Sequence, residues 1–212
     1  MVLLWLMYYF HTFDGCKTYK IILMVKTKKN HILKSINFNY IFKKSISLFL
    51  ILLTLLIIIV YIFPEDHVLP VEGSSHFDWN SASFWDKRGS IIHKGIDIFV
   101  KEKGIFALSS TNGVVIFNGY LSLGGNVIFI LGPKWKIYYY AHLEKSFVGF
   151  GDIINISQKI GIVGKTGNAL NTPPHLHFGI MTMMPLIWRW DRSPEGWKKI
   201  FYLDPDKILL SK

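Results

Sequence analysis

Residues 113–143 read GVVIFNGYLSLGGNVIFILGPKWKIYYYAHL, and this stretch decides the fold of the carboxyl-terminal part of the 212-residue chain. Short runs of Val, Ile, Phe and Tyr alternate in it with Gly, Asn and Pro, which is the pattern of β-strands joined by tight turns. The pair Gly124-Gly125 separates two of these runs in a way that fits a hairpin. Because the stretch has no sustained 3.6-residue period, it predicts consecutive strands rather than helices.

The same pattern continues through the chain after Pro64, which holds sixteen of the seventeen glycines. Their spacing of roughly ten residues is typical of sandwiches and barrels. The sequence therefore predicts an all-β domain, with an antiparallel, sandwich-like sheet. The expected strands cover residues 105–108, 113–120, 126–131, 136–142, 152–156, 161–164 and 175–181. This part of the chain has no Cys, so packing alone must stabilise it.

A transmembrane helix is predicted ahead of this domain. Residues 45–63, SISLFLILLTLLIIIVYIF, are nineteen uncharged residues of which sixteen are apolar. As a helix they would span about 28 Å, close to the ~30 Å hydrocarbon core of a bilayer. We expect an uncleaved anchor, because signal peptides have shorter apolar cores and no A-x-A-like site follows Phe63. A cleaved signal peptide and a translation start at Met24 are the alternatives.

The net charge of +10 indicates membrane topology rather than nucleic-acid binding. Residues 1–44 carry eight Lys against Asp14, whereas the part after Pro64 has 16 basic and 13 acidic residues. By the positive-inside rule, the amino-terminal segment is expected in the cytoplasm and the β domain on the other side of the membrane. No nucleic-acid partner is needed to explain the charge.

Composition divides the chain into five expected parts. The parts are a basic cytoplasmic segment (1–44), the anchor (45–63), a lead-in rich in Pro, Gly and Ser (64–84), the β domain (85–182) and a Trp-rich extension (183–212). The end of the lead-in stays open, because Trp79, Phe84 and Trp85 are suited to core packing. The extension is expected to lie against the sheet as a flap.

Two histidine motifs point to a metal site. His93 and Asp97 are four residues apart, and His175 and His177 are two apart, so each set would share one face of a strand. Apolar residues, as expected of core-facing positions, alternate with each set: Ile96 and Ile98 with the first, and Leu176, Phe178 and Ile180 with the second. By the same alternation, His142 is expected to share a face with Tyr138 and Tyr140.

The spacing of His93 and Asp97 sets a condition on a shared metal. Four strand steps cover about 13 Å, so the backbone must bend between them, and Gly95 at the midpoint permits this. Two imidazoles and one carboxylate around Zn²⁺, with the fourth position open, form a known catalytic arrangement. A lone H-x-H pair is usually two surface histidines, and only the combination with the first motif favours a metal. The spacing does not say which histidine of the pair binds.

Six segments extend these motifs over about ninety residues. They are HKGIDI (93–98), GVV (113–115), GGNVIFI (124–130), YAHL (140–143), IGIVGKTG (160–167) and PHLHFGI (174–180). In this order they resemble the lysostaphin-type, or LytM-like, zinc endopeptidases, which cut peptide cross-links of bacterial peptidoglycan. One departure is Ser157 before Gln158, where the family usually has Gly, which puts the local turn geometry in doubt.

The resemblance implies a role for each matching residue. It makes His93, Asp97 and His177 the ligands of one Zn²⁺ per chain, and His142 and His175 the catalytic pair that assists without binding metal. It also implies a membrane-anchored metalloendopeptidase that hydrolyses peptidoglycan peptides at the outer side of the bacterial cytoplasmic (inner) membrane.

Two other classes of protein remain open at this stage. Some LytM-like proteins have lost ligands and act as regulators that bind and activate a cell-wall amidase or division partner. A simple wall-binding module would need no histidines. The filled ligand set favours the enzyme, while the bond cut, the oligomeric state and the choice of general base between His142 and His175 are not encoded in any motif.

Overall fold

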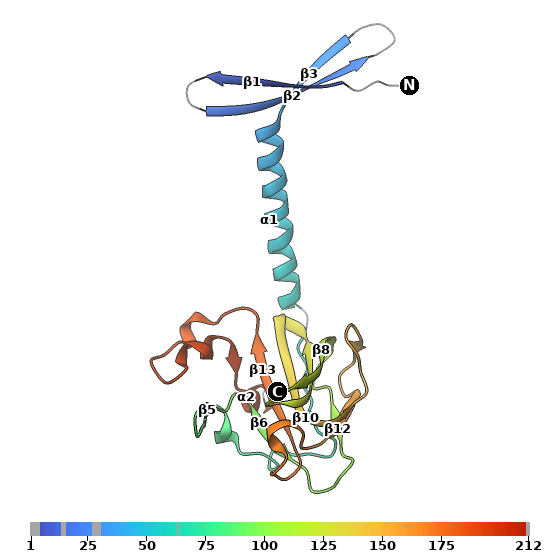
Figure 1. The fold of residues 1–212 in the computed structure, drawn as a ribbon, viewed down its shortest axis with the longest axis vertical. Helices are drawn as coiled ribbons and strands as arrows, with labels where there is room; N and C mark the ends of the chain where they lie inside the picture. The colour runs from blue at the N-terminus through green and yellow to red at the C-terminus, as the bar shows by residue number, and fades with distance from the viewer. Residues whose placement is uncertain (1–4, 14–15, 27–30, 63, 211–212) are drawn as a thin grey trace. The chain divides into compact units, whose positions relative to one another are not determined.

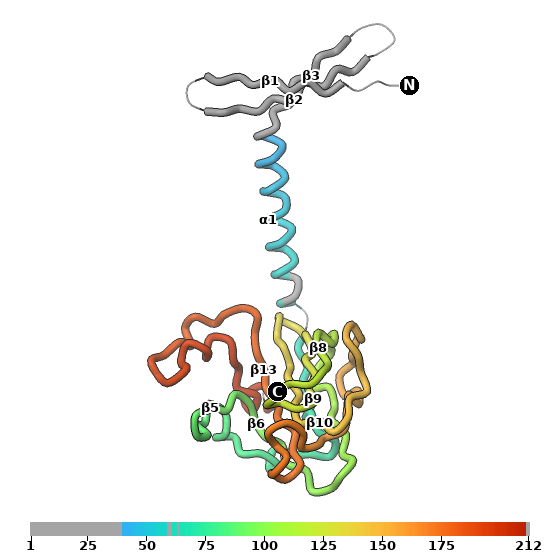
Figure 2. The backbone as a smooth tube through the Cα atoms, in the orientation of Figure 1, coloured from blue at the N-terminus to red at the C-terminus, as the bar shows by residue number. Residues whose placement is uncertain are grey.

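The computed structural model describes residues 5–13, 16–26, 31–62 and 64–210. The chain divides into two compact units, Met1–Ile59 and Val60–Lys212, and Figure 2 traces their backbone.

The first unit contains a small sheet and most of a long helix. Strands β1 (Trp5–Phe13), β2 (Cys16–Lys26) and β3 (His31–Asn37) pair antiparallel in that order, in a segment for which the sequence predicted no strands. Helix α1 (Phe38–Ile62) follows directly. Its apolar span, Tyr40–Ile58, is long and apolar enough to cross a membrane, and none of its residues is buried in the protein. The helix begins seven residues before the predicted segment, whose last residue, Phe63, lies outside the described residues.

The second unit is built on a nine-stranded antiparallel sheet, so the predicted fold class is confirmed (Figure 1). Its strands are β6 (Ile96–Phe99), β7 (Phe106–Leu108), β8 (Gly113–Leu121), β9 (Gly125–Leu131), β10 (Lys136–Ser146), β11 (Ile153–Ile154), β12 (Lys159–Val163), β13 (His175–Thr182) and β14 (Tyr202–Leu203). Smaller elements are the hairpin of β4 (Lys87–Arg88) and β5 (Ile91–Ile92), helix α2 (Pro205–Leu210) and the 3₁₀ turns η1 (Ser81–Ser83), η2 (Pro133–Trp135), η3 (Gly167–Ala169), η4 (Ile187–Arg189) and η5 (Gly196–Ile200).

Strand β10 is the centre of the sheet. One edge pairs with β9, while the other edge pairs first with β13 and then, from Leu143 onward, with β12. Strand β13 in turn pairs with β6 and β14. Strands β6 and β13 therefore lie side by side, although they are about eighty residues apart in the sequence.

The core forms on one face of these strands. Ile96 and Ile98 of β6 and Leu176, Phe178 and Ile180 of β13 are fully buried, as the alternation predicted. Burial of each such side chain stabilises the fold by about 1.5–3 kcal/mol relative to exposure. Because side chains alternate along a strand, the remaining residues of both strands point to the opposite face.

The lead-in and the extension pack against this sheet. Val71 is 2% exposed and bridges to Ala107, which places the lead-in beside β7. The extension supplies β14, and its Leu203 and Leu209 join the core. The two segments also meet, since the Trp79 indole donates to Asp206 at 2.8 Å.

One prediction of side-chain direction is wrong. Tyr138 and Tyr140 are in the core, but His142 is not with them and lines the opposite, open face. The pairing of β10 shifts register between Tyr140 and Leu143, and His142 has a φ of 62°. Such a β-bulge inserts one residue into the alternation and redirects the side chains around it.

The turn between β11 and β12 carries the residue that departs from the family pattern. Ser157 has a φ of 65° there, a left-handed conformation that glycine adopts without the clash of a Cβ atom. Ser157→Gly is expected to raise the free energy of unfolding by about 0.5–1 kcal/mol, as measured by denaturation of the full chain in detergent. Ser122→Gly, on another exposed turn with negative φ, serves as the control and should not be stabilising. A Ser157→Gly protein less stable than its parent would contradict this account.

Candidate metal centre and active site

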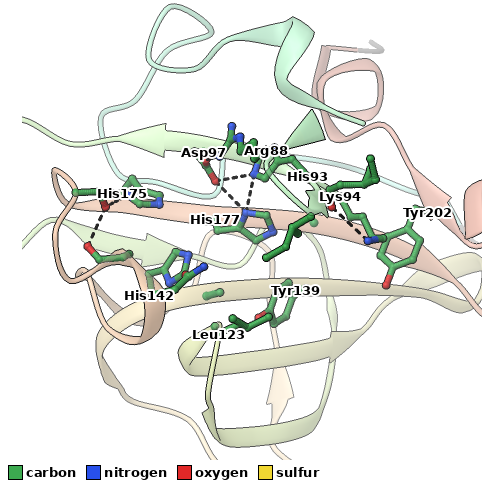
Figure 3. Close-up of a pocket in the computed structure, with 18 of the residues that line it drawn as sticks. Arg88, His93, Lys94, Asp97, Leu123, Tyr139, His142, His175, His177 and Tyr202 are labelled. Carbon is green, nitrogen blue, oxygen red and sulfur yellow. Dashed lines mark hydrogen bonds and ion pairs between the residues drawn. The ribbon is translucent and has the colours of Figure 1, made fainter. Parts of the chain in front are cut away.

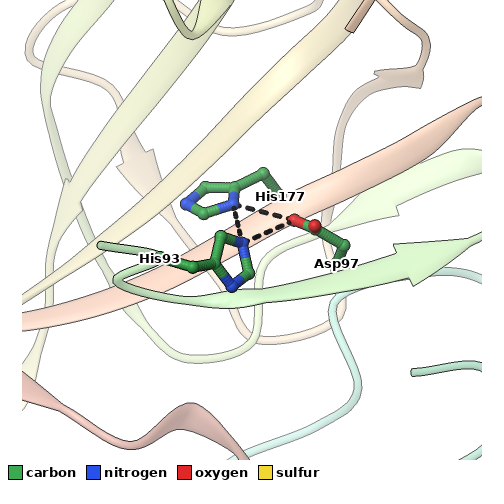
Figure 4. A group of neighbouring side chains, drawn as sticks. All are labelled: His93, Asp97 and His177. Carbon is green, nitrogen blue, oxygen red and sulfur yellow. Dashed lines mark hydrogen bonds and ion pairs between the residues drawn. The ribbon is translucent and has the colours of Figure 1, made fainter. Parts of the chain in front are cut away.

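Three side chains converge on the open face of the sheet where β6 meets β13 (Figure 4). Asp97 is on β6, His177 is directly opposite it on β13, and His93 precedes β6. The distances are 3.0 Å from His93 Nε2 to Asp97 Oδ1, 2.9 Å from His177 Nδ1 to Asp97 Oδ1, and 3.0 Å from His93 Nε2 to His177 Nδ1.

The chain bends at Gly95, which brings His93 back to Asp97 as the spacing required. A Cβ atom at Gly95 would lie 2.4 Å from the Phe178 carbonyl oxygen and 3.0 Å from the His177 ring. Glycine is therefore required by close packing against β13, in addition to the bend.

The donor set fits a zinc ion. His93 Nδ1 donates to the Ser83 carbonyl at 2.8 Å, because a carbonyl can only accept, and this leaves the lone pair of Nε2 facing Asp97 Oδ1. Two acceptors 3.0 Å apart require a cation or a proton between them. Their separation is close to the roughly 3.4 Å between ligands about 2.1 Å from a tetrahedral zinc.

Asp97 is kept ionised by its surroundings. Burial raises the pKa of this carboxyl, but the hydrogen bond from His177 Nδ1 opposes burial, and the pKa lies well below its ordinary value. Arg88 donates to the other carboxylate oxygen, Oδ2, at 2.5 Å. Arg88 therefore orients Asp97 so that Oδ1 faces the two imidazoles.

His142 and His175 lie together beside the three converging side chains (Figure 3). Their ring centroids are 4.9 Å apart, and that of His142 is 5.9 Å from that of His177. His142 Nδ1 donates to the Thr166 carbonyl at 2.9 Å, and His175 Nδ1 donates to the Pro173 carbonyl at 2.8 Å. Both rings therefore present the lone pair of Nε2 and can accept a proton.

The protonation state of His142 suits it to accept a proton. Burial lowers the pKa of His142 to about 4, with the neighbouring His175 and His177 adding to the shift and the Thr166 carbonyl opposing it. The imidazole is therefore neutral near pH 7.

These five residues line one cavity of about 650 Å³. Its wall also contains Tyr139, Phe99 and Leu123, together with Arg88 and Lys94 as cations. A volume between about 300 and 1,000 Å³ is typical of ligand pockets. The cavity is large enough to admit a peptide segment beside the converging side chains.

The structure brings together all five residues singled out in the sequence. The sequence analysis did not identify Arg88 or the Ser83 and Thr166 carbonyls, which orient Asp97, His93 and His142. An isolated arginine and two main-chain oxygens carry no signal in a single sequence, because their contacts depend on β4, η1 and the loop before η3.

Comparison with known proteins agrees with the fold. Residues 91–187 match the model of Peptidase family M23. The L-Ala–D-Glu endopeptidase of Bacillus subtilis is 34% identical over 150 residues, covering 65% of this chain and 45% of that protein. The peptidoglycan DD-endopeptidase ShyC of Vibrio cholerae is 34% identical over 86 residues, covering 41% of this chain and 19% of that protein.

A solved structure supports the fold. Lysostaphin from Staphylococcus simulans aligns with a TM-score of 0.50 at 24% identity, over 69% of this chain and 54% of the other.

The fold and the donor set thus define a metallopeptidase-type domain. This chain matches the model of peptidase family M23 over residues 91–187; named homologues of that family are endopeptidases, and its members are zinc-dependent. It spans less than half the length of the curated relatives just described.

Proposed function

We propose that this protein is a membrane-anchored zinc endopeptidase that hydrolyses peptide bonds of bacterial peptidoglycan. The observation that carries the proposal is the convergence of His93 Nε2, Asp97 Oδ1 and His177 Nδ1 beside two histidines whose tautomers are fixed. A regulator that only binds a partner would need no such complete donor set, so the non-enzymatic alternative is not favoured.

In the proposed mechanism, one zinc ion per chain is held by His93, Asp97 and His177. When bound, zinc lowers the pKa of water and polarises a carbonyl group. His142 and His175 are the proton-transfer pair, because both present Nε2 to the same cavity. One accepts a proton from the attacking water as the C–O bond forms and passes it to the leaving amine nitrogen as the C–N bond breaks. The other, in its protonated form, donates to the oxyanion of the tetrahedral intermediate.

The substrate class follows from the relatives' names, which specify L-Ala–D-Glu and DD peptide bonds in two different bacteria. The name of the Vibrio cholerae relative also specifies peptidoglycan, and we propose peptidoglycan peptide as the substrate of this chain without assigning the bond. We also propose that the domain lies outside the cytoplasmic membrane, and the eight Lys of residues 1–44 support this orientation by the positive-inside rule.

The test is digestion of purified peptidoglycan by the full chain in detergent. We expect release of new peptide amino groups, loss of release after treatment with a zinc chelator, and recovery when zinc is added back. Mass analysis of the products identifies the bond. Chelator-resistant release, or no release from a preparation containing one zinc per chain, would refute the proposed activity.

A further inference from the structure

The carboxyl-terminal extension exposes a group of large apolar side chains that the proposed active site does not use. We name it the Trp loop, and it consists of Met183, Ile187, Trp188 and Trp190. Their exposed fractions are 53%, 73%, 80% and 56%. Exposed apolar patches rimmed by polar residues commonly mark a binding surface.

The Trp loop begins close to Glu65, which is three residues after the last residue of helix α1 in the sequence. Glu65 is fixed on the start of β10, because its carboxylate pairs with Lys136 at 2.6 Å and Lys134 at 3.1 Å. The amide of Met183, the first residue of the Trp loop, donates to the carbonyl of Trp135, between these two lysines.

Chain length then limits how far this end of the sheet can be from the membrane. Ile62 ends α1, and Glu65 is only three residues later, so their Cα atoms are at most about 11 Å apart. The headgroup region on each side of the hydrocarbon core is roughly 5–8 Å deep. If α1 spans the membrane as proposed above, the Trp loop starts within reach of the headgroups.

The chemistry of the Trp loop suits that environment. Tryptophan is enriched at membrane interfaces, where its ring contacts acyl chains and its N–H remains hydrated. The acidic side chains next to the loop are neutralised, with Asp191 paired to Lys199 and Glu195 to Lys198. Anionic headgroups would therefore meet little unpaired negative charge there.

We propose that the Trp loop inserts into the headgroup region of the membrane that anchors the chain. Strand β13 runs from His175 at the cavity to Thr182 next to the Trp loop, a length of about 23 Å. The cavity would then be at most about this far from the inserted Trp loop, which assigns the substrate to peptidoglycan close to the membrane surface. This inference rests on the proposed anchor.

The test uses the full chain in lipid nanodiscs with Cys16 replaced by Ser. A polarity-sensitive dye is attached to Ile187→Cys, and its quenching by doxyl-labelled lipid is measured. The matched control is Phe150→Cys, which is 81% exposed in the native chain but follows the other end of β10. Leu53→Cys reports on α1. We expect quenching at 187 to exceed that at 150 by about twofold or more.

Each outcome decides between the hypotheses. Quenching at 187 no stronger than at 150, with 53 quenched, overturns the membrane insertion and leaves the anchor standing. A dye at 187 that responds to peptidoglycan fragments but not to lipid would assign the Trp loop to the wall instead. An unquenched position 53 overturns the anchor and the inference together. Lipid quenching at 187 without peptidoglycan hydrolysis refutes only the proposed activity.

Discussion

Asp97→Ala is expected to lose zinc and peptidoglycan hydrolysis together. The carboxylate supplies the only negative charge among the three converging side chains, and its Oδ1 contacts both His93 and His177. Without it, two imidazoles remain, and we expect zinc affinity to fall by more than about 100-fold, since even weaker outer-shell changes cost 10–100-fold. Metal analysis of the purified chain and product release from peptidoglycan measure the two effects.

A matched control separates this effect from a general loss of charge. Glu102→Ala removes an exposed carboxylate on the loop after β6 and should keep zinc and activity. Asp97→Asn keeps the size of the side chain and serves as a second variant. An unchanged near-ultraviolet circular dichroism spectrum of this variant would show that its core packing is native. An Asp97→Ala protein with one tightly bound zinc would remove Asp97 from the ligand set.

His142→Ala is expected to keep zinc and to lose turnover by about 100-fold or more. Its ring lies beside the converging side chains, while Nδ1 is occupied by the Thr166 carbonyl, so only its proton-accepting Nε2 is lost. The left-handed backbone at position 142 strains alanine, and His142→Asn is the better-matched variant because asparagine tolerates this conformation.

Zinc content and rate together identify the role of His142. His76→Ala removes an exposed histidine outside the cavity and should leave both unchanged. Normal hydrolysis in His142→Asn would exclude His142 from proton transfer. Loss of zinc in both His142 variants would instead place it with the ligands.

Local sequence patterns predicted most of the strands. Residues 105–108, 113–120, 126–131 and 175–181 differ from β7, β8, β9 and β13 by one residue at an end. The glycine-bounded apolar runs predict these strands correctly because strand periodicity and turn chemistry are properties of neighbouring residues.

The wrong prediction for the direction of the His142 side chain has a different physical origin. Simple alternation from Tyr138 and Tyr140 assigns His142 to the core face, and no residue type in the segment indicates a β-bulge. The extra residue lies in the pairing of β10 with β9, at the point where the other edge of β10 exchanges β13 for β12. That exchange involves strands distant in the sequence.

The sequence by itself determined the all-β class of the domain, an apolar helix able to span a membrane, and the residue types of a zinc site, because composition, period and motif spacing are local. Only the tertiary structure decided how these residues meet. The pairing of β6 with β13 sets Asp97 opposite His177, and the bulge in β10 turns His142 toward His175. The first depends on hydrogen bonds between strands about eighty residues apart, and the second coincides with the exchange of β13 for β12 beside β10, and no local pattern encodes either.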